Sequence, residues 1–234
     1  MKTILMRELR AYFWSPLGYV IIAVMYFFTA YYFFTYNLYG NTTDTSVMFS
    51  MLFSVAMFVA PVLTMRLLSE EKRAKTEQTL LTAPVSRLGI VLGKYIAAVL
   101  LFLTAISGTL VMALVLQRYS QPDWPVIVGN FIGLSLLGAA LIAICLFVSA
   151  FTESQVVAAV GGFGASLFLM LSDALAYVAR SPALRALLSL FSFNGRYKGF
   201  TIGVIELVDV CFFVSIAGLF VALTVIVFER RRWT

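Results

Sequence analysis

Histidine is absent from this sequence of 234 residues, and cysteine and charged residues are scarce. Without histidine there is no His-dependent catalytic triad, no HExxH zinc motif, no His-ligated haem and no histidine proton relay. The two cysteines, Cys145 and Cys211, lie inside apolar runs. We interpret them as buried small hydrophobic residues, ahead of a disulfide or a metal site. The sequence thus predicts neither a catalytic residue nor a metal ligand.

Charged residues make up only 12% of the chain, whereas 62% is hydrophobic, and the mean hydropathy is +0.96. A soluble domain of this size has no way to bury so much apolar surface, so the composition predicts an integral membrane protein. The N-terminus carries basic residues and an apolar run, but no small-residue cleavage site follows, and we expect it to be retained. We treat residues 1–234 as a single transmembrane domain.

Several apolar segments are long enough to cross a bilayer, which needs about 20 residues in a helix. The expected spans are residues 17–36, 47–67, 88–116, 126–151, 156–171 and 204–228. These lengths predict an all-α protein with six transmembrane helices.

Three features within the expected spans have a structural interpretation. Pro61 is expected to kink the second span, because proline interrupts the helical hydrogen-bond ladder. Gly129 and Gly133 form a GxxxG pattern that predicts close packing of helices. The glycines around position 162 and the pair Gly93-Lys94 do not complete a Walker A motif, so we expect no ATP site of that kind in this chain.

Before the first span, apolar and basic residues recur with helical spacing. Apolar side chains fall on one stripe, and the arginines lie opposite. A basic amphipathic helix with aromatic residues is typical of a helix lying in the membrane interface, and Ser15-Pro16 separates it from the first span. The residues that define this interfacial helix are Leu5, Arg7, Leu9, Arg10, Tyr12 and Phe13.

Residues 66–86, between the second and third spans, are the longest polar run. Glu71 and Lys75 stand four apart in the order that supports a helix, and Pro84 ends it. Ser69 is a candidate for the helix start, with an incomplete capping box. The pattern has two interpretations: a solvated helix that only separates two spans, or a docking helix for a cytoplasmic partner. The residues alone slightly favour the first.

Residues 172–203 form the second informative stretch. Ser181-Pro182 is typical of a helix start, and Asn194-Gly195 predicts a turn. The stretch is too short and too interrupted to cross the membrane, so we expect a shallow or re-entrant helical element at the outer face. The residues assigned to this outer gate element are Leu184, Leu187, Leu188, Phe191, Glu206 and Asp209.

The distribution of lysine and arginine predicts the orientation. With the N-terminus inside, twelve of the 17 basic residues are cytoplasmic and five are outside. The five are Arg118, Arg180, Arg185, Arg196 and Lys198. The positive-inside rule therefore predicts that both termini and the polar run at 66–86 lie in the cytoplasm.

Taken together, these elements resemble the permease subunits of ABC-2-type ABC transporters. The family's coupling helix has the form E-(E)-x-x-x-x-T-x-x-x-L-L-x-x-P, and residues 68–86 read LSEEKRAKTEQTLLTAPVS. Residues 196–209, RYKGFTIGVIELVD, look like the approach to the last span in the gliding-motility-associated branch. One departure is Lys75-Thr76, where the family often has Gly-Thr. With this resemblance, docking becomes the preferred interpretation of the polar run.

The resemblance implies a set of partners. ATP and magnesium would bind a separate ATP-binding subunit, present in two copies, and this chain would itself be neither an enzyme nor a cofactor protein. A second permease, identical or related, would complete an export path in a bacterial or archaeal cytoplasmic membrane. A further periplasmic or extracellular subunit stays open, and no nucleic acid is expected. The coupling residues implied to dock on the ATPase are Glu70, Glu71, Arg73, Thr76, Glu77, Leu80 and Leu81.

The competing class is an ATP-independent membrane transporter or a structural membrane subunit. Ion-coupled transport favours charged residues deep inside the spans, and the middle of each expected span is nearly free of them. We also find no inverted repeat, which many secondary transporters have. An ATPase encoded by the neighbouring gene would discriminate between the classes.

Overall fold

The computed structural model describes residues 2–73, 87–179 and 181–230, and all regular elements there are helical. The four residues of the coupling prediction from Thr76 to Leu81 therefore lie outside the described residues. The helices are α1 (Lys2–Trp14), α2 (Pro16–Tyr32), η1 (Phe33–Leu38), α3 (Ser46–Thr64), α4 (Ser69–Arg73), α6 (Arg87–Ile106), α7 (Gly108–Tyr119), α8 (Trp124–Ala150), α9 (Gln155–Val178), α10 (Pro182–Leu190), α11 (Phe193–Thr201) and α12 (Leu207–Arg230).

Six helical segments of the described chain are long and apolar enough to cross a membrane, as predicted. They are Pro16–Leu38, Ser46–Thr64, Leu88–Tyr119, Trp124–Ala150, Gln155–Val178 and Leu207–Glu229. The protein is thus an all-α, multi-pass membrane protein. The predicted end of the fifth span at residue 171 is wrong, because the helix continues through Ala174, Leu175 and Ala176, which are good helix formers.

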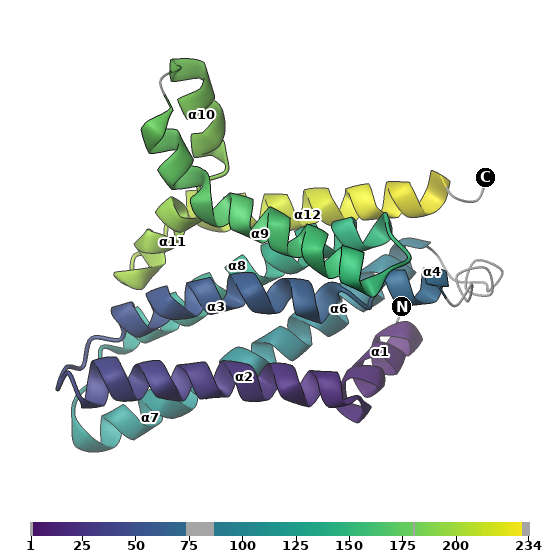
Figure 1. The fold of residues 1–234 in the computed structure, drawn as a ribbon. Helices are drawn as coiled ribbons and strands as arrows, with labels where there is room; N and C mark the ends of the chain where they lie inside the picture. Colours follow the sequence, from purple (N-terminus) through teal and green to yellow (C-terminus); the bar gives the residue numbers. More distant parts are fainter. Residues whose placement is uncertain (1, 74–86, 180, 231–234) are drawn as a thin grey trace.

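The long helices run side by side, and Figure 1 shows which elements gather at each end of the bundle. Helices α1 and α4 and the C-terminal end of α12 lie at one end, on the right of the view. The η1–α3 and α7–α8 connections lie at the other end, and α10 stands away from the bundle. The predicted interfacial helix and the described part of the predicted coupling helix therefore lie at the same end of the molecule.

The third span is broken between α6 and α7 at Ser107. The Thr104 hydroxyl donates to the Leu101 carbonyl, and the Ser107 hydroxyl donates to the Thr104 carbonyl, both at 2.7 Å. Such side-chain bonds to the preceding turn bend helices. The Tyr26 ring occupies the space beside Gly108, where an added Cβ would come within 2.9 Å of it. The extra length of this span is thus taken up by a bend.

Helix α8 packs against α3, α6, α9, α11 and α12, so it lies at the centre of the bundle. The predicted close packing at its GxxxG pattern is confirmed, and the helix it accommodates is α11. A Cβ at Gly133 would lie 2.6 Å from the Cβ of Phe200, and a Cβ at Gly129 would lie 3.3 Å from the Cα of Gly203. Gly138 makes room for the Phe102 ring of α6 in the same way.

Replacing Gly133 tests this packing. Because Phe200 is fully buried beside it, Gly133→Ala overpacks the contact, and we expect a loss of about 1–3 kcal/mol of stability. Gly164→Ala is the matched control, since an added Cβ there meets nothing within 4 Å. Thermal unfolding in detergent should show a lower midpoint for Gly133→Ala alone. Equal midpoints for the two variants would show that α11 is not held at this glycine.

Residues 181–200 form two short helices, α10 and α11, as predicted for this stretch. Ser181 is the N-cap of α10, with proline in its first turn. The predicted turn at Asn194-Gly195 is wrong, because both residues lie inside α11. The chain turns earlier, at Phe191–Ser192, and the backbone N–H of Gly195 donates to the Asp173 carboxylate at 3.2 Å. That bond holds an N–H of the first helical turn, which has no partner within the helix.

Candidate functional site

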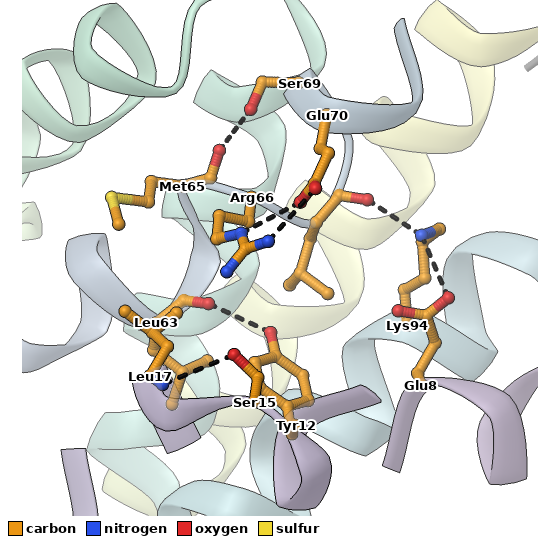
Figure 2. A network of polar contacts seen from close by, with 11 residues as sticks. Glu8, Tyr12, Ser15, Leu17, Leu63, Met65, Arg66, Ser69, Glu70 and Lys94 are labelled. Atoms are coloured by element: carbon orange, nitrogen blue, oxygen red, sulfur yellow. Dashed lines mark hydrogen bonds and ion pairs between the residues drawn. The ribbon is translucent and has the colours of Figure 1, made fainter. Parts of the chain in front are cut away.

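The described part of the predicted coupling helix is α4, which holds Glu70, Glu71 and Arg73. Arg73 is exposed, and Glu70 accepts two hydrogen bonds from the Arg66 guanidinium, at 2.9 and 3.0 Å (Figure 2). The hydroxyl of Ser69, the first residue of α4, donates to the Met65 carbonyl. These bonds tie α4 to the turn that follows α3.

The Arg66 guanidinium holds the pKa of Glu70 below its ordinary value near 4.5, chiefly through their hydrogen bonds. A lowered folded-state pKa means that the pair stabilises the fold above the unfolded pKa and loses this effect as pH falls through the folded value. Because Glu70 is half exposed, the contribution is about 0–1 kcal/mol.

Removing the carboxylate should therefore flatten the acid limb of the stability curve. We expect Glu70→Gln to lower stability slightly at pH 7 and to make it less sensitive to pH below about 4.5. Arg66→Gln should have the same effect, because it removes the cation that lowers the pKa. The test is to measure unfolding midpoints between pH 3 and 7, at intervals of about one pH unit. An unchanged acid limb in both variants would contradict the ion pair.

Lys94 is the most deeply buried charge near α4, with only 1% of its surface exposed. Its ammonium donates to the Leu67 carbonyl at 2.8 Å and pairs with the Glu8 carboxylate at 3.3 Å (Figure 2). Glu8 belongs to α1 and also pairs with Arg7 at 2.6 Å. Lys94 thus joins the first helix, the α3–α4 turn and α6 at one point.

Tyr12 makes a second connection between α1 and α3. Its hydroxyl donates to the Leu63 carbonyl at 2.9 Å (Figure 2). The ring is buried, and this burial raises the pKa of the phenol, so the hydroxyl stays protonated and donates at every physiological pH.

The α8–α9 turn reaches the same region through Glu153. Its carboxylate lies 3.4 Å from the Lys72 ammonium of α4. The turn directly precedes α9, whose helix begins at Gln155. Helix α4 therefore contacts the beginning of the fifth span as well as the end of the second.

A cavity of about 320 Å³ opens between α1, the α3–α4 turn, α4 and α6. Its charged lining consists of Arg7, Glu8, Arg66, Glu70 and Lys94. We call these residues, with Tyr12 and the Leu67 carbonyl, the α1–α4–α6 junction. Its charges form ion pairs, of which Lys94–Glu8 connects α6 to α1.

The residues predicted for the interfacial helix divide between two environments. Tyr12 is buried, and Leu5, Leu9 and Phe13 pack partly against the core. Arg7 and Arg10 are exposed on the other side, as the stripe predicted. Close approach of α1 to α6 depends on Gly93, where an added Cβ would lie 3.1 Å from the Ile4 side chain. Much of the apolar stripe of α1 therefore faces α6.

The residues of the predicted outer gate element are spread over α10 and the start of α12. Leu188 is buried, whereas Leu184, Phe191 and Glu206 are exposed. Leu187 lies in α10. Asp209 pairs with Arg196 of α11 at 3.1 Å, and that guanidinium also lies 4.2 Å from the centre of the Phe212 ring.

Helix α11 is attached to the bundle by residues that the sequence analysis did not single out. The Tyr197 hydroxyl donates to the Phe49 carbonyl at 3.3 Å. The Thr201 carbonyl accepts from the Ser46 hydroxyl at 2.7 Å and from the Asn130 amide at 3.2 Å. An asparagine inside the apolar run of α8 was the available signal, because a buried polar side chain in a membrane needs a partner.

Sequence reasoning also missed the role of Lys94 and Glu8. Lys94 served as a cytoplasmic charge in the orientation argument and as part of a rejected Walker A pattern, although it lies inside an apolar run and such a charge needs a partner. The described residues contain no cluster of acidic, cysteine or histidine side chains able to hold a metal ion. Cys145 is buried as expected, but Cys211 is exposed on α12, so its predicted burial is wrong.

The fold and the junction define a polytopic α-helical membrane protein whose helices meet in a polar network at one end. A family model described as ABC-2 family transporter protein matches residues 16–228. The chain therefore belongs to the ABC-2 family of transporter proteins, and this membership implies association with an ABC ATP-binding subunit. The match does not single out the gliding-motility branch. A search of curated proteins found no match.

Proposed function

We propose that this chain is the membrane subunit of an ATP-driven exporter and that ATP hydrolysis occurs in a separate ATP-binding subunit. Residues 69–83 dock on that subunit in the cytoplasm. Closure of two ATPase subunits pulls on this segment, tilts α3 against α9 and opens a path between two permease subunits. The residues of this chain transmit motion, so ATP and magnesium bind only in the partner.

The observation that carries the proposal is the attachment of α4. Within the described residues, α4 is bonded to the turn that follows α3 through Arg66–Glu70 and to the α8–α9 turn through Lys72–Glu153. A pull on α4 therefore acts on the second and fifth spans together. These spans also contact each other directly, with Gly162 of α9 against Pro61 of α3 and the Phe58 and Phe163 rings 6.1 Å apart.

The charges buried in the described spans favour this proposal over ion-coupled transport. Lys94 and Asp209 are the buried charged residues of the described chain. Each lies near one end of its span and has a partner, Glu8 and Arg196 respectively. A proton or ion relay instead needs ionisable groups along the bundle interior.

Co-purification with an ATPase tests the proposal. The chain is expressed from its natural gene locus in its natural membrane, and an affinity tag is placed on this chain only. We expect the ATPase to be recovered in an amount comparable to the permease, and the ATPase expressed without the permease to remain in the soluble fraction. A permease that purifies folded and free of ATPase under these conditions would contradict the proposed function.

A further inference from the structure

We propose that Lys94 is a positioning residue that makes α1, the α3–α4 turn and α6 move as one unit when the ATPase acts. The inference rests on the proposed function and adds to it the part of the membrane domain that receives the motion. In this account the interfacial helix moves together with the coupling segment. Lys94 touches neither ATP nor cargo; it acts through the groups that it binds.

The geometry around Lys94 argues against a residue that only sets membrane orientation. A lysine near the end of a span normally extends its ammonium to water. Here the side chain is 2% exposed and is directed at a carbonyl and a carboxylate on two other elements. Its stem lies in α6, the carbonyl belongs to the α3–α4 turn and the carboxylate belongs to α1.

The cost of burying an ammonium ion also argues for a role other than stability. A buried ion pair often contributes no more to stability than apolar residues of similar size. The gain from such a group is a defined arrangement of the elements it joins. Lys94 makes directional bonds that fix the α3–α4 turn relative to α1. An apolar side chain at the same position would lack these bonds.

The other bonds at the junction connect only two elements each. Tyr12 joins α1 to α3, and Arg66–Glu70 joins the α3–α4 turn to α4. Without Lys94, motion of α4 would still reach α3, but α6 would lose its polar link to the α3–α4 turn. Lys94 is therefore the residue whose loss should separate ATPase docking from transmission to α6.

The test uses the complete complex of permease and ATPase in proteoliposomes, with the variants Lys94→Met and Lys94→Arg. Methionine keeps an unbranched side chain, and Glu8 retains Arg7 as a partner at 2.6 Å, so the fold is expected to persist. We expect Lys94→Met to bind the ATPase as the wild type does, but to reduce the permease-dependent change in ATP turnover about fivefold or more. Lys94→Arg keeps donors for both acceptors and should restore most of the effect.

Two further measurements make the result specific. Lys198→Met is the matched control, because Lys198 is exposed on α11, and it should behave as the wild type. Spin labels at Arg10 of α1 and at Leu88 of α6, both exposed, should keep one narrow distance distribution when the wild type is trapped with nucleotide and vanadate. The distribution should broaden in Lys94→Met.

The outcomes separate this inference from the proposed function. If the wild-type permease recovers no ATPase, the proposed function fails. If Lys94→Met binds the ATPase and alters turnover as the wild type does, with an unchanged label distance, the role of Lys94 fails and the proposed function stands. If Lys94→Met does not fold, Glu8→Met is measured in its place. Methionine removes the acceptor on α1 and with it the bond from Lys94 to that helix, so wild-type coupling and label distances in that variant also overturn the role of Lys94.

Discussion

Leu80→Asp should abolish stable association with the ATPase, or leave it bound without any effect of the permease on ATP turnover. Thr76, Leu80 and Ala83 share one face if residues 69–83 are helical up to Pro84. A docked face buries Leu80, and an unpaired aspartate there costs about 3 kcal/mol or more. That cost corresponds to about a hundredfold weaker binding.

The comparison variants keep this result interpretable. Thr43→Asp adds the same charge to an exposed loop at the opposite end of the bundle and should leave the ATPase bound. Glu71→Arg should weaken binding by only about 0–1 kcal/mol, the typical value of an exposed ion pair. The assay is recovery of the ATPase on tagged permease, beside the amount of permease in the membrane. Wild-type recovery with Leu80→Asp would return this segment to the status of an ordinary linker.

Thiol labelling should give an all-or-none result for the orientation. In a Cys145→Ala, Cys211→Ser background, we expect Thr43→Cys and Ser120→Cys to react with an impermeant reagent in intact cells. Lys75→Cys should react only after the cells are permeabilised. The reason is the distribution of basic residues, of which twelve lie on the side assigned to the cytoplasm and five outside.

Labelling of Lys75→Cys in intact cells would reverse the orientation and place the coupling segment where no ATPase can reach it. The background removes both native thiols, Cys145 and Cys211, so that any signal comes from the introduced cysteine. Ser107→Cys, in the bent third span, is a suitable negative control in both conditions because a thiol inside the bilayer is shielded from a charged reagent.

The spans could be predicted because hydropathy and length fix them with little tertiary information. The fifth span shows the limit of this argument. Its predicted end at residue 171 lies just before Asp173, but Asp173 accepts a hydrogen bond from the Gly195 backbone, and the helix continues past it. A local window cannot include a partner that lies far along the chain.

The junction shows the same limit at the candidate site. The polar run at 66–86 was visible because its charged residues lie close together in the sequence, and its docking role was predicted from the family resemblance. Lys94 and Glu8 are far apart in sequence and meet only when α1 folds back on α6. The apolar stripe of α1 predicted a surface helix, but its packing against α6 depends on the small residue Gly93, which no periodicity reveals.

ATP turnover by the purified ATPase subunit, with and without this chain in proteoliposomes, tests the central claim most directly. The account predicts that the wild-type permease changes the turnover rate and that Leu80→Asp removes this change, leaving the rate of the ATPase alone. The same turnover with the wild-type chain, with Leu80→Asp and with no permease would contradict the claim that this chain converts ATPase motion into movement of a membrane domain.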